Sequence, residues 1–159
     1  MADRHSPLGG WSVERSGLRL RELPLLAQIS VRSPSAPPVP ALRLGPDEWL
    51  IVGERAQETD MLDRLRHAMA GQRAQLLDVT ASRTTIEIAG PGATELLTKG
   101  CGLDLHPQVF PPGQAAATIL ARTGVILHLV DPAPTWRVLV RASYARYLRD
   151  WLSTALAHD

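Results

Sequence analysis

Cysteine is nearly absent from this sequence of 159 residues, and aromatic residues are few. Cys101 is the only cysteine, so an intrachain disulfide is impossible and no cysteine-based zinc site can be closed. Four Trp, two Tyr and one Phe leave little for a surface on which nucleic-acid bases stack. These shortages exclude a disulfide scaffold and argue against a base-stacking platform.

A surplus of charge of one sign is missing as well. Lys and Arg number 17 against 16 Asp and Glu, which gives a formal net charge of +1. Binding to nucleic-acid phosphates needs a basic surplus, so we predict no nucleic-acid partner. No apolar stretch is long enough to span a bilayer, and the N-terminal MADRHSPLGG lacks the apolar core of a signal peptide. We therefore expect a cytoplasmic protein without a membrane partner.

Common nucleotide and nucleophile motifs are also missing. The sequence has no Gly-x-Gly-x-x-Gly stretch, no phosphate-binding loop and no Gly-x-Ser-x-Gly elbow. Cys101, Asp104 and His106 are close in sequence, but a thiol nucleophile needs a base and an orienting group within hydrogen-bond reach, and a metal needs more ligands. We predict a structural role for Cys101 and hydrogen bonds from turn amides to Asp104. No catalytic, cofactor-binding or metal site is expected in this chain.

Composition divides the chain into a short arm and one domain. Residues 1–16 carry scattered charge without periodicity and predict a loose N-terminal arm of the kind that is often ordered only against a partner. Residues 17–159 predict a single domain. Inside it, residues 33–40 (SPSAPPVP) hold four prolines and predict an extended surface loop.

Hydrophobic periodicity indicates the elements of that domain. Helices are predicted over residues 58–70, 91–97 and 143–156, with Thr59 and Ser143 as caps and Pro91 at the first helical position. Alternating or short apolar segments predict strands at residues 18–20, 29–31, 41–44, 49–53, 76–79, 84–89, 115–121, 125–130 and 136–141. Strand runs interrupted by single helices favour an α+β fold with mainly antiparallel strands and three helices.

Four segments in a fixed order carry a resemblance to a known family. They read LRLGPDEWLIVG (residues 42–53), LDVTASRTTIEIAGPGA (77–93), KGCGLDLHPQVFPPG (99–113) and VRASYARY (140–147). The second resembles a stretch of the glycine cleavage T-protein, and the others resemble the gamma subunits of heterotetrameric sarcosine oxidases. Both belong to the folate-binding T-protein-like superfamily, whose fold the chain is therefore expected to share from about residue 6 to residue 156.

The resemblance implies membership of a heterotetramer with alpha, beta and delta partner subunits. In such complexes the large subunit binds NAD and tetrahydrofolate, a second subunit carries FAD and FMN, and a small subunit binds zinc. Together they oxidise sarcosine or another N-methyl amino acid. The implied role of this chain is structural, with no cofactor of its own.

One strand departs from the T-protein pattern. Residues 124–130 read GVILHLV, where the T-protein has Gly-x-Ile-Asp-Asp-Leu with a carboxylate that serves folate. Leu127 and His128 occupy the acidic positions here, and Leu127 cannot accept a hydrogen bond or exchange a proton. The departure argues against an independent folate enzyme. The alternative is a stand-alone folate-binding protein for aminomethyl transfer or iron–sulfur cluster maintenance. Lys99-Gly100-Cys101 resembles part of the signature of folate-fold proteins that serve cluster maintenance.

Candidate contacts with partner subunits lie in the arm and in the proline-rich loop. Apolar groups in a segment without periodicity have no evident place in the core, and tryptophan is enriched at interface hot spots. Proline-rich segments lose little backbone entropy when they are immobilised. The predicted interface residues are Leu8, Trp11, Val13, Pro37 and Pro38. The alternative for Trp11 is that it packs onto its own domain.

Overall fold

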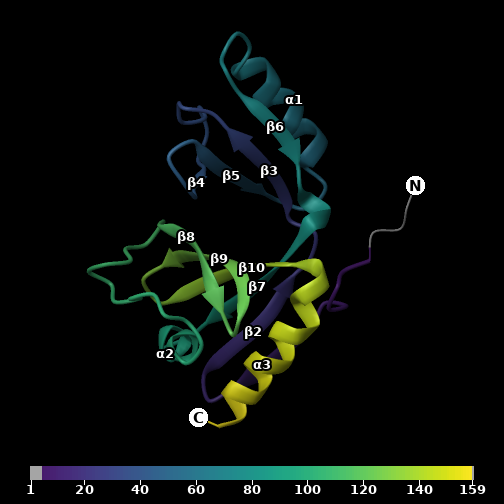
Figure 1. The fold of residues 1–159 in the computed structure, drawn as a ribbon. Coiled ribbons are helices and arrows are strands. Elements are labelled where there is room, and N and C mark those ends of the chain that lie inside the picture. The colour runs from purple at the N-terminus through teal and green to yellow at the C-terminus, as the bar shows by residue number, and fades with distance from the viewer. Residues whose placement is uncertain (1–4, 159) are drawn as a thin grey trace.

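The computed structural model describes residues 5–158, which form two β-sheets and three α-helices (Figure 1). The helices are α1 (Glu58–Ala68), α2 (Ala93–Thr98) and α3 (Ala145–Ala157). The layers follow the order α1, small sheet, large sheet, and then α2 with α3 (Figure 1). All strand pairs named in either sheet are antiparallel, so the predicted α+β class with three helices is confirmed.

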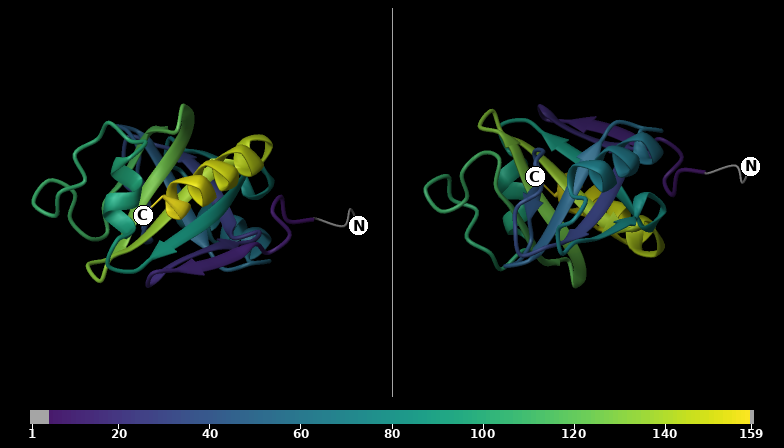
Figure 2. Two further views of the ribbon diagram at one scale, coloured as in Figure 1. Left: turned by 90° about the horizontal axis from the view of Figure 1, so that it is seen from below. Right: turned by 90° about the horizontal axis from the view of Figure 1, so that it is seen from above.

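The large sheet has six strands in the order β1-β2-β7-β10-β9-β8. Their bounds are β1 (Ser12–Arg15), β2 (Leu18–Leu23), β7 (Arg83–Ala89), β8 (Ala115–Leu120), β9 (Thr123–Asp131) and β10 (Thr135–Arg141). One face of this sheet packs against α2 and α3, as the view from below shows (Figure 2). Because side chains alternate between faces, the opposite face of the same strands is turned toward the small sheet.

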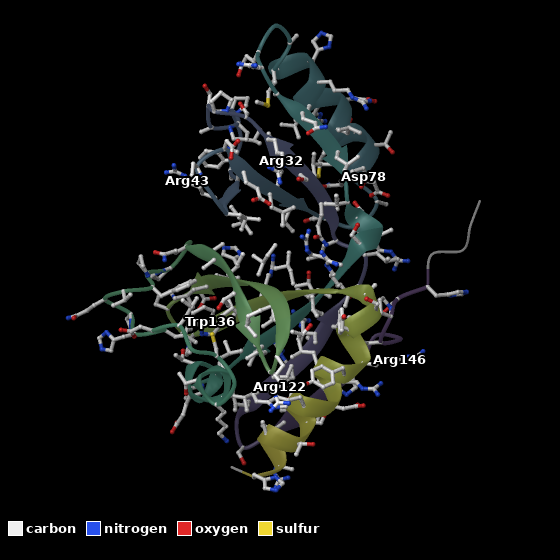
Figure 3. All side chains as sticks on the ribbon, in the orientation of Figure 1. Arg32, Arg43, Asp78, Arg122, Trp136 and Arg146 are labelled. Carbon is white, nitrogen blue, oxygen red and sulfur yellow. The ribbon has the colours of Figure 1, made fainter. Side chains whose placement is uncertain are left out.

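The main core fills the space between the large sheet and the two helices below it. Trp136 is fully buried there, and its Nε1 donates a hydrogen bond of 3.0 Å to Thr94 Oγ1 at the start of α2 (Figure 3). The ring of Phe110 lies 5.1 Å from that of Trp136, in a tilted arrangement typical of aromatic pairs. Large apolar residues of β2, β7 and β10 complete the core and fix α2 and α3 to the sheet.

The small sheet has four strands in the order β4-β5-β3-β6. Their bounds are β3 (Ala27–Arg32), β4 (Leu42–Arg43), β5 (Glu48–Gly53) and β6 (Gln75–Asp78). One face is covered by α1, whose Leu65 packs against Ile29 together with Met69, the residue that follows the helix. The other face meets the large sheet through Leu50, which packs with Ile126 and Leu139. The two sheets therefore touch through a small apolar cluster.

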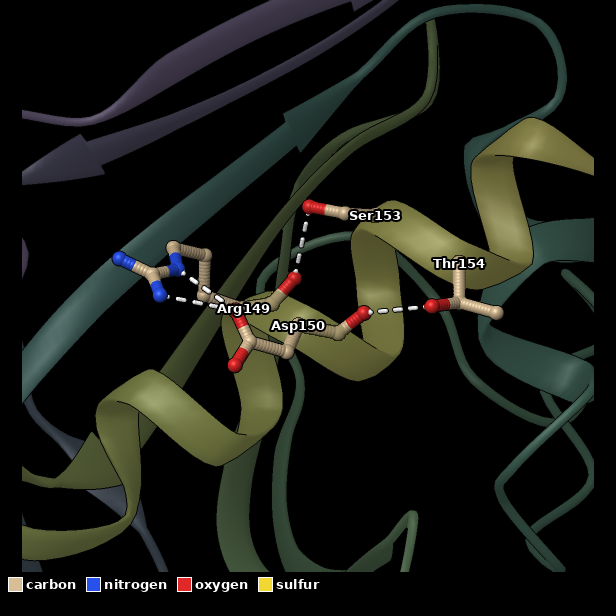
Figure 4. Close-up of polar contacts among 4 residues, drawn as sticks. All are labelled: Arg149, Asp150, Ser153 and Thr154. Carbon is tan, nitrogen blue, oxygen red and sulfur yellow. Dashed lines mark hydrogen bonds and ion pairs between the residues drawn. The ribbon is translucent and has the colours of Figure 1, made fainter.

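The long C-terminal helix α3 is amphipathic as predicted. It buries Leu148 and Leu152 against the large sheet. On its polar side Ser153 Oγ donates to the Arg149 carbonyl at 2.9 Å and Thr154 Oγ1 donates to the Asp150 carbonyl at 3.0 Å (Figure 4). These hydroxyls are thus satisfied within the helix. Within residues 5–158 we find no helix that is long and apolar enough to cross a membrane.

The predicted helix caps are wrong. Thr59 lies inside α1, and within the described chain the N-cap residue Gln57 makes no side-chain capping bond. Ser143 lies in a 3₁₀ turn, and the backbone amide of Ala145 bonds the carbonyl of Ala142 instead. The 3₁₀ turn thus gives a backbone amide at the start of the helix a hydrogen-bond acceptor, which a capping side chain would otherwise provide. Pro91 likewise precedes α2, which begins after Gly92.

The predicted loose arm also needs correction. Met1–Arg4 lie outside the described residues, but Ser12–Arg15 forms β1 and pairs with β2 along its whole length. The connection is a two-residue turn in which Ser16 and Gly17 both have positive φ, at 51° and 79°. Such turns match the twist of a β-hairpin. From Ser12 onward the predicted arm is therefore part of the sheet.

Candidate functional site

A row of charged and polar side chains crosses the large sheet on the face turned toward the small sheet. Directly paired residues in an antiparallel sheet share a face. The register pairs Arg21 with Glu87, Glu87 with Arg137, and Arg137 with His128, so these side chains form one row across β2, β7, β10 and β9. The neighbouring row on the same face includes Thr85 of β7, paired with Leu139 of β10. Residues far apart in sequence are brought together in this way.

The charges of this row are unbalanced. Glu87 is buried and accepts a hydrogen bond of 2.9 Å from Arg21 Nε, with Arg21 Nη2 at 2.8 Å from the same oxygen. Arg19 Nη2 lies 3.9 Å from Glu87 Oε1, and Arg137 Nε lies 3.9 Å from Glu87 Oε2. Three guanidinium groups thus surround one carboxylate, which leaves a local positive potential. Arg21 is the arginine that hydrogen-bonds to the Glu87 carboxylate.

A cleft of about 310 Å³ opens between the two sheets above this row. Its floor is formed by the large sheet, which contributes Thr85, His128 and Arg137, and its walls are mainly apolar. The lining residues are Leu26, Pro40, Ala41, Leu42, Leu50, Val52, Thr85, Gly113, His128, Arg137 and Leu139. Side chains from both sheets project into the space between them (Figure 3).

Three polar groups in the floor of the cleft have unusual environments. Thr85 is 1% exposed, and its hydroxyl has no hydrogen-bond partner among the described residues. Arg137 Nε is buried and also lacks a hydrogen-bond partner within residues 5–158, since its 3.9 Å distance to Glu87 is too long for one. Burial, and then the neighbouring Arg137, lower the pKa of His128, which keeps the imidazole neutral near pH 7.

The strand that departs from the T-protein pattern divides its two residues between the faces of the sheet. Leu127 is fully buried in the main core, whereas His128 lines the cleft. No carboxylate is among the described residues that line the cleft. Glu87, the nearest acid in the row, is held by Arg21 and is not free to act as a base. The cleft therefore offers no free carboxylate, and the polar groups of its floor are the Thr85 hydroxyl, the Arg137 guanidinium and the His128 imidazole.

The segment with Cys101, Asp104 and His106 is built as a turn. Asp104 Oδ1 accepts a 2.9 Å hydrogen bond from the His106 amide, which confirms the predicted role of Asp104. His106 Nδ1 in turn accepts from the Gln108 amide at 3.2 Å. Cys101 is half-buried against the main core and pairs with Leu120 at the end of β8. In the part of the chain that the structure describes, no three His, Cys, Asp or Glu side chains are grouped to hold a metal ion.

The predicted interface residues of the N-terminal segment lie against the protein's own core. Leu8 is 8% exposed, and Trp11 and Val13 are half-buried against the main core. Trp11 therefore packs as its alternative interpretation predicted. Gly9 and Gly10, both with positive φ, turn the chain so that Leu8 reaches the sheet. Any contact of this segment with a partner remains a prediction and is limited to the sides that these residues leave exposed.

A buried glutamate that the sequence analysis did not single out fixes this N-terminal segment. Glu22 is 5% exposed and accepts hydrogen bonds from the backbone amides of Leu8 (3.3 Å) and Gly10 (2.9 Å) and from Thr84 Oγ1 (2.7 Å). Ser6 Oγ donates to the same carboxylate. The sequence indicates this burial only through the position of Glu22, two residues after Leu20 and therefore on the apolar face of β2.

The proline-rich loop provides the more exposed candidate surface. Pro37 is buried, whereas Pro38 and Val39 are exposed at the edge of a second cavity of about 420 Å³ between this loop, β5 and α1. The loop is anchored because Trp49 Nε1 donates to the Ser33 carbonyl at 3.2 Å. Of the predicted interface residues, only Pro38 is fully on the surface. The groove beside it is lined mainly by apolar side chains.

The edge strand β8 is a second candidate contact surface. It forms one end of the large sheet, contains no charged residue, and exposes 57% of Ile119. Edge strands of soluble proteins are commonly protected by charges or prolines, because an unpaired edge can pair with another chain. The composition of β8 is therefore typical of a strand that is covered in an assembly.

The fold and its sequence define a particular family. The family model described as "Sarcosine oxidase, gamma subunit family" matches residues 13–158. The chain belongs to this family. It is 37% identical over 116 residues to the sarcosine oxidase subunit gamma of Corynebacterium sp. (strain U-96), a match that covers 73% of this chain and 55% of the relative. It is 34% identical over 130 residues to that of Corynebacterium sp. (strain P-1), with 82% and 63% covered. The alignments thus span little more than half the length of these curated relatives.

Solved structures agree with this assignment. A chain of the heterotetrameric sarcosine oxidase from Corynebacterium sp. U-96 superposes with a TM-score of 0.82 at 28% identity, covering 98% of this chain and 95% of that one. The glycine cleavage system aminomethyltransferase T from Bartonella henselae gives a TM-score of 0.68 at 13% identity, covering 87% of this chain and 46% of that one. The second likeness shows the fold alone, and it confirms the T-protein-like fold expected from the sequence.

Proposed function

We propose that this chain is the gamma subunit of a heterotetrameric, flavin-dependent oxidase of sarcosine or another N-methyl amino acid, and that its role in the complex is structural. The observation that carries the proposal is the family match across residues 13–158, together with a structural match to a chain of a heterotetrameric sarcosine oxidase over 98% of this chain. The partners are then the alpha, beta and delta subunits. FAD, FMN, NAD, tetrahydrofolate and zinc are bound by those partners.

The chemistry of the cleft supports a non-catalytic role. Among the described residues that line the cleft there is no carboxylate of the kind that the T-protein strand carries, and Glu87 in the neighbouring row is bound by arginines. The sequence also has no dinucleotide-binding motif. We therefore expect the isolated chain to bind no flavin and to show no oxidase activity.

The contact surfaces for the partner subunits are, in this proposal, the groove beside Pro38 and the edge strand β8. Both expose apolar groups, namely Pro38 and Val39 beside the groove and Ile119 on β8. Substituting Ile119 with Lys places a charge on the edge strand, which disfavours pairing with another chain. Val39→Glu places a charge beside the groove.

Co-expression of this chain with the other subunits tests the proposal. The I119K and V39E variants are each expected to lower the yield of complex at least several-fold while the thermal unfolding of the isolated chain stays unchanged. Gln72→Lys, at an exposed turn after α1, is the matched control and should assemble normally. A chain that assembles equally well with both surface variants uses other surfaces. A purified isolated chain that releases flavin, or that binds and turns over folate, is a stand-alone enzyme and contradicts the proposal.

A further inference from the structure

The cleft between the sheets contains a buried hydroxyl without a partner. Thr85 is 1% exposed, lines the cleft, and makes no hydrogen bond through Oγ1 to any described residue. Buried polar groups in folded proteins nearly always have a hydrogen-bond partner, and each exception calls for an explanation. A ligand in the cleft would supply the missing partner.

The charge beside this hydroxyl selects an anion. Arg137 lines the cleft and has an unpartnered, buried Nε within the described chain, while the carboxylate of Glu87 is already bound by Arg21 at 2.8 and 2.9 Å. A cationic ligand would meet unfavourable charge here and a neutral ligand would gain no charge pairing, whereas an anionic group gains a charge-assisted hydrogen bond.

The walls of the cleft determine the rest of the ligand. Leu26, Leu42 and Val52 are among the apolar residues that face the cavity from the small sheet and its loops. A volume of about 310 Å³ lies at the lower end of the range for small-molecule sites, about 300–1,000 Å³. One guanidinium and one hydroxyl suit a single planar anionic group on an apolar body.

We infer that this cleft binds a small organic monocarboxylate, with its carboxylate held by Arg137 and the hydroxyl of Thr85, beside His128, and its apolar body between the two sheets. The cleft adjoins the groove beside Pro38, with which it shares the lining residues Pro40 and Val52, but the inference holds whether or not the chain assembles with partner subunits. It gives a ligand-binding role to a chain whose proposed function is structural.

The test uses the purified full-length chain and benzoate, an aromatic monocarboxylate, with benzamide as the neutral analogue of the same shape. Titration is followed by the amide resonances of β7, β9 and β10 in ¹⁵N-labelled protein. Benzoate should shift the resonances of Thr85, His128 and Arg137 in a saturable manner, and benzamide should bind at least about tenfold more weakly, because it lacks the charge-assisted hydrogen bond.

Matched variants separate a built site from general attraction by positive charge. Arg137→Gln should weaken benzoate binding at least about tenfold, and Thr85→Val, which removes only the hydroxyl, by about fivefold. Arg19→Gln is the control, because Arg19 lies at the same 3.9 Å from Glu87 as Arg137 but does not line the cleft. It should keep the wild-type affinity.

Three outcomes overturn the inference: equal binding of benzoate and benzamide, equal losses in the R19Q and R137Q variants, or saturating shifts confined to residues that do not line the cleft. If R137Q does not fold, the T85V variant decides alone. A folded T85V protein with unchanged benzoate affinity contradicts the assigned role of the hydroxyl. None of these outcomes bears on assembly with partner subunits, so the inference and the proposed function fail separately.

Discussion

Replacing Glu22 with alanine should destabilise the folded chain strongly, although the side chain is far from the cleft. The carboxylate accepts from the Leu8 and Gly10 amides and from the Thr84 hydroxyl. After the substitution, water can reach the Gly10 amide, which lies on the surface, but the Leu8 amide and the Thr84 hydroxyl remain in buried positions. An unsatisfied buried donor costs about 1–3 kcal/mol. Two such donors predict a loss of about 2–6 kcal/mol of unfolding free energy.

The assay is urea unfolding of the full-length chain followed by circular dichroism, with thermal unfolding as a second measurement. For a domain of this size, each kcal/mol lowers Tm by about 2–4 °C, so a drop of at least about 4 °C is expected. Glu14→Ala, an exposed glutamate on the neighbouring strand β1, is the control and should stay within about 0.5 kcal/mol of wild type. A loss below about 1 kcal/mol for E22A would refute the reasoning. The N-terminal segment would then be weakly attached and available for a partner.

Other substitutions test the core, the cleft and the cysteine. Gly100→Ala should cost about 1–3 kcal/mol, because its Cβ would lie 2.6 Å from Trp151 Cζ2, whereas Gly102→Ala meets nothing within 4 Å and should be neutral in the same urea titration. Burial lowers the pKa of His128 from its ordinary value of 6.5, so below pH 6.5 the unfolded chain binds a proton that the folded chain binds less readily. The free energy of unfolding should therefore decrease as the pH is lowered through this range. His128→Asn should flatten this fall between pH 7.5 and 5.5, and an unchanged slope would contradict the assigned environment. Cys101→Ser should lower stability by about 1 kcal/mol and leave the activity of the assembled complex nearly intact; lost turnover with full assembly and flavin content would show chemistry at the thiol.

The elements that the sequence predicted well are those with strong local patterns. The stripe of apolar residues in α3 and the alternation in β7 each repeat over several residues, so local periodicity was sufficient to place them. Strand β1 was missed because it is a four-residue edge strand without buried residues, held mainly by its pairing with β2. The caps failed because the helices begin from backbone turns rather than from capping side chains.

The cleft could not be predicted from local patterns, because its floor is assembled from three strands. Thr85, His128 and Arg137 lie on β7, β9 and β10 and converge only through the register of the large sheet. Glu22 was missed for a similar reason, since its partners come from the N-terminal segment and from β7. Leu127 and His128 are neighbours on β9, and side chains alternate between the two faces of a strand. Leu127 therefore lies in the main core and His128 in the cleft.

The most direct test of the proposed function is to purify the native chain from its source under mild conditions and to identify its companions by mass spectrometry. Flavin is measured by absorbance in the complex and again in the isolated chain. We predict a stoichiometric complex with flavin-bearing and folate-domain subunits that oxidises an N-methyl amino acid, and a colourless isolated chain. A chain that is purified without such subunits, or that carries flavin by itself, would contradict the assignment as a structural gamma subunit.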